Sequence, residues 1–388
     1  MFPLENPFIL APMAGITDLP FRRLIRKMGA GCVVTEFVSA HAIAYGGPRV
    51  ERYLAYHAEE RPVGLQIFGG DDDILEIASQ KAQDLGFDFL DINLGCPVPK
   101  VTRKGGGSAW LCMPTELGTM LSRIRKTLTI PFTIKIRTGW DAQTINANEI
   151  VRIARESGVD AVAIHGRTRA QGYSGVANWD LISEIAQNQK MPIIGNGDLI
   201  TGPQAAARFL VSGCKGVMVG RGALKNPWIF LEASEALEQL LKIPEAIRLK
   251  VAHEILEKFN VADEAKKKAE ENYYVRKIKK TQPKPIDETA GVVGIRADRN
   301  ASLLLDLHLK FLREFYPESR VTFGFRKFLA WYSAGYPGSH VFRKFIFTNE
   351  HFDQIYEESL RFFDSIKALG THADSQREEA PVLMSGHG

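Results

Sequence analysis

The sequence is poor in cysteine, and its cysteines lack the spacing that would make them structural. Cys32, Cys96, Cys112 and Cys214 form no CxxC pair and no zinc pattern, so we expect free thiols in a reducing compartment. No apolar run of about 18 residues occurs, which argues against a membrane span. The N-terminal segment has neither a basic start nor a cleavage site, so the sequence predicts a cytoplasmic protein without a secretory signal.

A strong excess of charge of either sign is also absent. The net charge is +4, which permits a nucleic-acid partner without requiring one. Apolar residues make up 45% and charged residues 24% of the chain, an ordinary balance for a protein that buries a large core. Its 388 residues exceed one average domain and suit a large domain with a smaller one added. We expect the chain to be a monomer.

Short apolar runs alternate with amphipathic stretches through the first part of the chain. The apolar runs are Phe8–Met13, Cys32–Phe37, Val63–Phe68, Phe89–Leu94, Phe132–Ile136, Ala161–His165, Pro192–Gly195 and Gly216–Val219. The stretches with helical spacing are Ile74–Leu85, Pro114–Leu128, Ala147–Ser157, Trp179–Gln187 and Gly202–Ser212, with Asp71, Thr115 and Thr201 as predicted N-caps. Repeated strand–helix–strand units predict parallel pairing with right-handed crossovers. Eight strands favour a (β/α)8 TIM barrel, an α/β fold, over an open doubly wound sheet.

The pattern changes to helices alone after Pro227. The clearest helical stretches are Ala246–Phe259, Ala301–Phe315, Gly324–Ala334 and Asn349–Leu369. We therefore predict a barrel domain over residues 1–243, a small C-terminal helical domain over 244–370 and a disordered tail over 371–388. Within the helical part, Lys266–Lys284 carries eight Lys and Arg against two Glu and interleaves them with tyrosines, a composition suited to RNA.

Polar residues close most of the predicted strands, and in a barrel of this kind the active site lies at those carboxyl ends. They include Gln66, Asn93, Lys135, Arg137, His165 and Asn196. Polar groups placed there are costly unless they meet partners, so we infer that they share one polar ligand. The glycine-rich turns Gly195–Asp198 and Gly220–Gly222 follow the last two strands. They predict a phosphate group on that ligand, with Arg221 as a bidentate partner.

Eight segments carry a resemblance to a known family. They read APMAGITD, TEF, LQIFG, DINLGCPVPKVTRKGGGSA, KIRTG, IHGRTRAQGYSG, NGD and VGRGAL. Together they resemble the tRNA-dihydrouridine synthases, the bacterial B-type above all, over Phe8–Phe230. The resemblance continues more weakly at Phe325–Lys327 and Trp331–Tyr332. Residues 265–298 look like an insertion into a connection that is shorter in the family.

The resemblance implies FMN as cofactor, NADPH or NADH as reductant, and reduction of the C5=C6 bond of specific uridines in tRNA. Cys96 would be the general acid that protonates C5. The residues that would hold FMN are Pro12, Met13, Ala14, Gln66, Lys135, His165, Asn196, Gly197, Asp198, Gly220 and Arg221. Those that would contact the uracil or the RNA are Asn93, Arg137, Arg167, Arg169, Tyr173, Arg326 and Lys327, and Arg343 and Lys344 are further candidates for docking the RNA.

Two other functions are compatible with the sequence. A flavin reductase of a small molecule, such as a free pyrimidine or dihydroorotate, would share the barrel, the FMN and the cysteine. It would leave the basic helical part without a purpose. An RNA-binding protein or RNA chaperone with incidental catalysis would depend on its basic residues and would tolerate the change of Cys96 to Ala.

Overall fold

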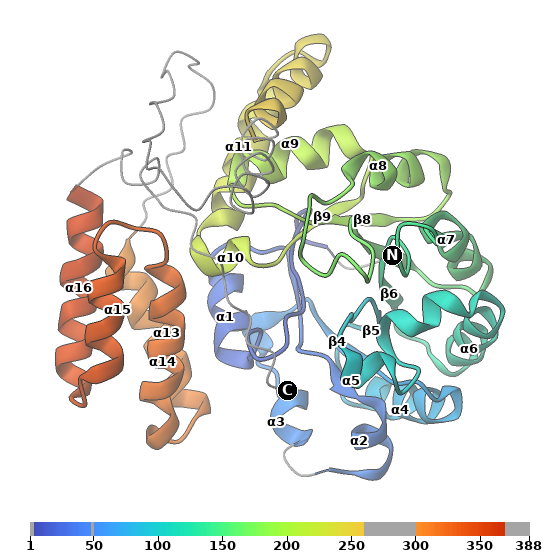
Figure 1. Cartoon of the computed structure of the whole chain (residues 1–388), viewed down its shortest axis with the longest axis horizontal. Coiled ribbons are helices and arrows are strands. Elements are labelled where there is room, and N and C mark those ends of the chain that lie inside the picture. Colours follow the sequence, from blue (N-terminus) through green and yellow to red (C-terminus); the bar gives the residue numbers. More distant parts are fainter. Residues whose placement is uncertain (1–3, 48–49, 260–299, 369–388) are drawn as a thin grey trace, which may run out of the picture.

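Eight parallel strands close into a barrel (Figure 1) in a computed structural model that describes residues 4–47, 50–259 and 300–368. The strands are β1 (Phe8–Leu10), β2 (Cys32–Val34), β4 (Val63–Phe68), β5 (Phe89–Leu94), β6 (Phe132–Arg137), β7 (Ala161–His165), β8 (Ile193–Asn196) and β9 (Gly216–Val219). β1 pairs with both β2 and β9, and β2 also pairs with β4, so the sheet closes on itself. The predicted TIM barrel is therefore confirmed, and the open sheet is excluded.

Helices follow the strands and surround the barrel (Figure 1). The longer helices are α1 (Leu19–Lys27), α4 (Asp72–Asp84), α6 (Pro114–Thr127), α7 (Ala147–Glu156), α8 (Trp179–Asn188), α9 (Gly202–Ser212) and α11 (Ile229–Lys242). The short helices are α2 (Ala40–Tyr45), α3 (Val50–Leu54), η1 (Ala58–Glu60), α5 (Pro99–Thr102), η2 (Gly107–Cys112) and α10 (Gly222–Lys225). Asp71 and Thr201 cap α4 and α9 as predicted, because each side chain accepts a backbone N–H of the first turn. The predicted cap at Thr115 is wrong: α6 begins at Pro114, and Met113 before it makes no side-chain cap bond.

Two strands end earlier than predicted because local hydrogen bonds bend the chain. β1 stops at Leu10, and the carbonyl of Met13 accepts the backbone N–H groups of Ile16 and Thr17 in a tight turn. β2 stops at Val34, and the chain returns to the sheet as the two-residue β3 (Val38–Ser39) beside β4. These bends turn the ends of the first two strands into loops at the mouth of the barrel.

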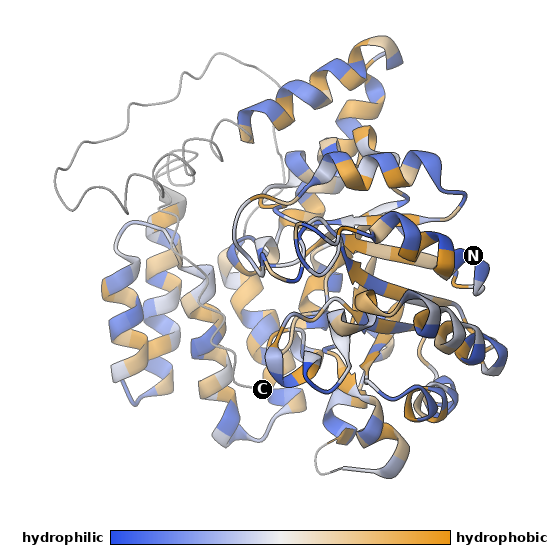
Figure 2. Cartoon of the chain, turned by 45° about the vertical axis from the view of Figure 1, so that its right-hand side comes forward, coloured by the Kyte–Doolittle hydropathy of each residue, from blue (hydrophilic) through white to orange (hydrophobic). Residues whose placement is uncertain are grey.

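The floor of the barrel is apolar. Small and medium apolar side chains meet there, namely Ile9, Ala11, Cys32, Val34, Phe89, Ala161, Ala163, Ile194 and Met218. A methyl group on Gly64 would lie 2.2 Å from the ring of Phe89, so the glycine leaves the space that this ring fills. In Figure 2 the strands are mostly hydrophobic, while the outer helices alternate between hydrophobic and hydrophilic residues.

Within residues 300–368 the structure has four helices: α13 (Ala301–Phe315), α14 (Glu318–Tyr332), α15 (Ser339–Thr348) and α16 (Phe352–Ala368). Residues 245–259 are helical as predicted. α14 begins six residues before the predicted Gly324, and α15 lies in the stretch predicted to be helical without being among the helices named there. The basic stretch Lys266–Lys284, the proposed insertion and the predicted tail lie outside the described residues. Within the described ranges, no helix is both long and apolar enough to span a membrane.

The C-terminal helices pack against α1 beside the barrel (Figure 1). The ring of Phe21 in α1 stacks on Phe328 of α14, with centroids 4.9 Å apart. Arg23 of α1 pairs with Glu314 of α13 at 2.5 Å. Because α1 follows the first strand, this packing brings the helical part next to the loop between β1 and α1, at the carboxyl end of the barrel.

Candidate active site

The inner face of the barrel changes from apolar to polar toward the carboxyl ends of the strands. Side chains alternate between the two faces of a strand, so Phe89, Asp91 and Asn93 of β5 share the inner face. The same alternation and the strand register group Gln66 of β4, Thr133, Lys135 and Arg137 of β6, His165 of β7 and Asn196 of β8 at this end. The polar residues singled out at the strand ends therefore come together.

A buried hydrogen-bond chain connects three adjacent strands. The side-chain amide of Gln66 donates to Asp91 at 2.7 Å and accepts from Asn93 Nδ2 at 2.8 Å. Thr133 Oγ1 donates to the other oxygen of Asp91 at 2.6 Å. Burial raises the pKa of Asp91 to about 6, although both of these hydrogen bonds oppose the shift. The chain fixes the orientation of Asn93, the last polar side chain before the cysteine turn.

Cys96 lies in a turn that Asn93 shapes directly. Asn93 Oδ1 accepts the backbone N–H groups of Gly95 at 3.1 Å and Cys96 at 2.9 Å. The Cys96 side chain is nearly buried, and this burial raises the pKa of its thiol, with a hydrogen bond from the Val98 backbone N–H and the charge of Arg137 only partly opposing the shift. The thiol is therefore protonated at neutral pH, which suits a proton donor.

Lys135 and His165 reach this site without a hydrogen bond or ion pair to any residue that the structure describes. Burial lowers the pKa of Lys135 to about 8, so the ammonium is still the main form at neutral pH. The pKa of His165 lies well below its usual value because of burial first, and then because of the positive charges of Lys135, Arg137, Arg167 and Arg221. The site thus combines a neutral imidazole and an unpaired ammonium in strongly positive surroundings.

The turn after β8 requires a glycine. Asn196 Nδ2 donates to the carbonyl of Met218 in β9 at 2.7 Å, which ties the two last strands together at their ends. Gly197 has a φ of +136°, and a methyl group on it would lie 2.4 Å from the Cβ of Ala177. No other residue fits there, so the glycine allows this turn to pack closely against Ala177.

Charged side chains surround the turns after β8 and β9. Asp198, with a φ of +50°, accepts from Arg167 Nη1 and from the Ala177 N–H, both at 2.7 Å. Arg221 follows β9, and its guanidinium lies 3.9 Å from the Asp198 carboxylate and 4.5 Å from the ring centre of Tyr173. Asp198 therefore already has one close arginine, and Arg221 keeps capacity for an anion.

The loop after β1 adjoins these turns. The Ala11 N–H donates to the carbonyl of Val219 at 2.9 Å, continuing the pairing of β1 with β9. A methyl group on Gly220 would lie 3.7 Å from the sulfur of Met13, which is itself buried. Pro12 is half-buried and Ala14 is exposed. The predicted FMN contacts at Pro12–Ala14 and at Gly220 thus belong to one continuous rim.

Comparison with known proteins identifies the family of the chain. The model of the Dihydrouridine synthase (Dus) family matches residues 9–292. The chain belongs to this family. It is 38% identical over 245 residues to the tRNA-dihydrouridine synthase B of Pseudomonas aeruginosa, covering 63% of this chain and 74% of that protein. It is 40% identical over 258 residues to the enzyme of the same name from Pectobacterium carotovorum, covering 65% of this chain and 80% of that protein.

Two of the arginines expected to contact substrate in this dihydrouridine synthase are held by the protein itself. Arg137 donates to the carbonyls of Gly95, Thr168 and Gly172. Arg167 donates to two loop carbonyls as well as to Asp198. Both side chains are buried. Their contact with the uracil or the RNA stays a prediction, and what the structure shows is that they shape the loops of the mouth.

The other predicted RNA contacts fall into two groups. At the mouth, Tyr173 is 47% exposed, and the guanidinium of Arg169 lies 4.3 Å from the ring centre of Trp140. In the helical part, Arg326 donates to the carbonyl of Asn349, and Lys327 reaches the barrel instead. The structure therefore does not bring Arg326 to the same cluster as Tyr173 and Arg169.

Sequence reasoning missed two buried carboxyl groups near the site, Asp91 and Glu36. Asp91 was visible only as an acid inside an apolar strand, two positions before Asn93. Glu36 follows β2 and is 7% exposed. Burial raises its pKa to about 6, assisted by the negative charge of Asp18 and opposed by the positive charge of Lys327. The signal available in the sequence was an acid inside the predicted apolar run Cys32–Phe37.

Proposed function

We propose that this dihydrouridine synthase uses FMN to reduce the C5=C6 bond of uridines in tRNA, with NADPH as the reductant and Cys96 as the general acid. One observation carries the proposal. The carboxyl end of the barrel holds a protonated, nearly buried thiol at Cys96 and the unpaired donors of Lys135 and His165. Membership of the family supplies the reaction, and these residues supply the groups that the reaction needs.

The donors at the mouth fit a flavin mononucleotide. Lys135 and His165 offer an ammonium and an imidazole to the polar edge of the ring, and neither has another partner among the described residues. Gly220 offers half-buried backbone and Arg221 a guanidinium to the phosphate, beside the turn that Gly197 shapes. When bound, FMN would supply a two-electron carrier between NADPH and the C5=C6 bond of the uracil. The ammonium of Lys135 would stabilise negative charge on the reduced ring.

Gln66 contributes to the site by holding its neighbours Asp91 and Asn93 in place. Its amide is occupied on both sides, by Asp91 as acceptor and by Asn93 as donor. Through Asn93 it holds the backbone N–H groups of the cysteine turn. A contact from Gln66 to the ring would have to use the remaining hydrogen-bonding capacity of this amide.

Cys96 completes the reduction by giving its proton to C5 of the uracil. The hydride at C6 and this proton at C5 together saturate the double bond, and water restores the proton to the thiolate. The raised pKa of the thiol keeps the proton in place until the transfer. Because a paired or stacked uridine cannot reach a nearly buried thiol, the target base must be turned out of its stack.

The RNA would lie across the mouth and the helical domain, predicted as residues 244–370. Tyr173 offers an exposed ring for stacking at the rim of the mouth. Cationic side chains of the helical domain, such as the exposed Lys344, would contact phosphates and so set the orientation of the RNA.

Mass spectrometry of tRNA tests the proposal. Bulk tRNA that lacks dihydrouridine is incubated with purified protein, FMN and NADPH, and we expect a gain of about two mass units at discrete uridines, absent without NADPH and in Cys96→Ala. A protein that binds FMN and is reduced by NADPH, but adds no mass to tRNA, would contradict the substrate. Ribosomal RNA and free pyrimidines would then be assayed in the same way.

A further inference from the structure

Gly15, at the tip of the loop between β1 and α1, is held by its backbone from two sides. Its carbonyl accepts a hydrogen bond from the ammonium of Lys327 in α14 at 2.9 Å. Its N–H donates to the buried carboxyl group of Glu36, which follows β2. Gly15 itself is exposed, has a φ of +72° and has no atom within 4 Å of the position of a Cβ. These two hydrogen bonds join the tip of the loop to α14 and to the segment after β2.

The place of Gly15 also sets the place of Met13. The carbonyl of Met13 accepts the N–H groups of Ile16 and Thr17, both at 3.0 Å, and the Met13 N–H donates to Thr17 Oγ1 at 3.1 Å. The five residues from Met13 to Thr17 thus form one closed turn. Behind it, Arg22 Nη1 donates to the carbonyl of Thr17 at 2.8 Å. A displacement of Gly15, at the tip of this turn, would therefore displace Met13, which lies at the rim where FMN is proposed to bind.

The side chain of Lys327 that contacts this turn is itself held in place by its neighbours. Its ammonium lies 4.5 Å from the ring centre of Phe328 and 5.5 Å from that of Trp331, so its position over the helix is restrained. The stacking of Phe328 on Phe21 holds α14 against α1. A second contact runs parallel to it, because the hydroxyl of Tyr316 donates to Asp18, the N-cap of α1, at 2.9 Å.

We propose that Lys327 is a positioning residue that couples the helical domain to the flavin site by holding Gly15 and, through the closed turn, Met13. This role differs from a direct contact with RNA, because it acts on the barrel when no RNA is present. A helical domain that shifts on binding RNA would move the rim of the flavin site through this contact. The inference depends on the proposed function only for the identity of the ligand at the rim.

The test measures FMN binding in the absence of RNA. FMN is removed from the full-length wild type, Lys327→Met, Lys327→Arg and Arg320→Met, and its dissociation constant is then measured by the change in flavin fluorescence. Arg320 is the charge-matched control, since it is an exposed cation in the first turn of the same helix, α14. The visible spectrum of the bound flavin, its rate of reduction by NADPH and the thermal unfolding of the FMN-free proteins are recorded in parallel.

We expect Lys327→Met to bind FMN about three- to tenfold more weakly, as expected when much of one charge-assisted hydrogen bond is lost. Its flavin spectrum should shift and its reduction by NADPH should slow, while Lys327→Arg restores both and Arg320→Met matches the wild type. Unchanged FMN affinity and an unchanged flavin spectrum in Lys327→Met would overturn the inference, even if the affinity for tRNA or the thermal stability of this variant falls. A wild type that binds no FMN would instead refute the proposed cofactor.

Discussion

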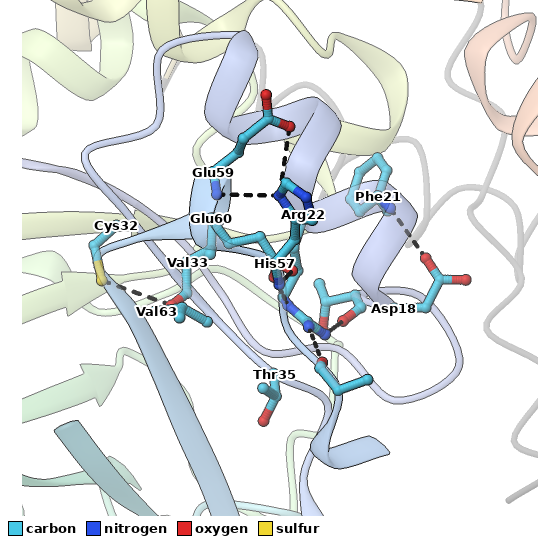
Figure 3. Close-up of polar contacts among 12 residues, drawn as sticks. Asp18, Phe21, Arg22, Cys32, Val33, Thr35, His57, Glu59, Glu60 and Val63 are labelled. Atoms are coloured by element: carbon cyan, nitrogen blue, oxygen red, sulfur yellow. Dashed lines mark hydrogen bonds and ion pairs between the residues drawn. The ribbon is translucent and has the colours of Figure 1, made fainter. Parts of the chain in front are cut away.

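Two regions of the molecule enclose basic side chains, and they differ in whether these side chains have partners within the protein. Behind α1 (Figure 3), the nearly buried Arg22 donates to Glu60 at 2.6 Å and to the carbonyls of Thr17 and Ala55 at 2.8 and 2.9 Å. Its neighbour Arg23 bonds two carboxylates. At the mouth of the barrel, by contrast, Lys135 and His165 have no partner among the described residues.

This difference in partners distinguishes side chains that stabilise the fold from side chains that are available to a ligand. A buried charge that the fold itself satisfies holds the fold together, as Arg22 does for the turn before α1. A buried donor that the fold leaves without a hydrogen-bond partner lowers the stability of the protein. Such donors are found at sites where a ligand provides the missing partner. The first region is thus expected to respond to mutation in its free energy of unfolding, and the second in its affinity for ligand.

The largest effect is expected for the acid at the mouth. Cys96→Ala should lower the rate of dihydrouridine formation by about 10²- to 10⁴-fold, because a general acid contributes about that much. FMN binding and the reduction of FMN by NADPH should be unchanged. Single-turnover assays with tRNA measure the effect, and Cys112→Ala, a change at an exposed cysteine, is the control. Equal losses in both variants would contradict the assignment.

The next effect concerns the satisfied region. Arg22→Met should lower the free energy of unfolding by about 3–5 kcal/mol, because it leaves Glu60 buried without its partner. Arg123→Met removes three ion pairs at the surface between α6 and α4 and should cost far less, because water replaces such pairs. Denaturant unfolding followed by circular dichroism compares the two. A larger loss in Arg123→Met would reverse the comparison.

The unsatisfied region should respond in the opposite manner. Lys135→Met should raise the dissociation constant of FMN about 10- to 100-fold, the loss of one charge-assisted hydrogen bond. The FMN-free protein should unfold no more easily than the wild type, because the substitution removes a buried charge that has no protein partner. Fluorescence titration and denaturant unfolding give the two quantities. A loss of stability like that of Arg22→Met would place Lys135 among the structural charges.

The pH dependence of FMN binding sharpens the same point. Burial lowers the pKa of Lys135 to about 8, so its ammonium form decreases as the pH rises through that value. FMN affinity should therefore be constant at lower pH and should fall above pH 8, because the neutral amine no longer attracts the anionic ligand. In Lys135→Arg the fall should move to higher pH, since arginine stays charged. A profile that is the same in both proteins would assign the titration to another group.

The smallest effect is expected at the rim. Tyr173→Leu removes an exposed ring that is available for stacking, worth about 1 kcal/mol per base, so the KM for tRNA should rise about fivefold. The affinity for FMN should not change. Steady-state kinetics with tRNA as the variable substrate measures the shift. An effect on FMN affinity alone would show that the ring supports Arg221 and does not contact RNA.

Much of the barrel and of its polar mouth could be predicted from local patterns. A strand buried on both faces needs a continuous apolar run, so Ala161–His165 was recognisable, and the polar residue at its end stood out. Gly197 was predictable within its turn because its backbone excludes other residues. The bounds of α15 were not predicted because Val341, Phe342 and Ile346 are weak helix formers, and the helix buries Phe342 and Ile346 against its neighbours.

The roles of the buried acids and of Lys327 could not be predicted, because they depend on residues far apart in the chain. Arg23 meets Glu314 across 291 positions, and Lys327 meets Gly15 across 312. No local pattern records such a distance. A lysine next to an arginine in α14 reads equally well as an RNA contact until the fold places it against the barrel.

The sequence by itself determined the order of strands and helices and the chemical groups at the strand ends, because the alternation of apolar and polar residues is a local property. Only the tertiary structure decided which charges are satisfied and which are free, because an ion pair forms over a few ångströms in space between residues from distant segments. Arg22 and Lys135 are both basic residues in segments with apolar residues nearby in the sequence. The fold gives Arg22 a carboxylate and gives Lys135 no hydrogen-bond or ion-pair partner among the described residues.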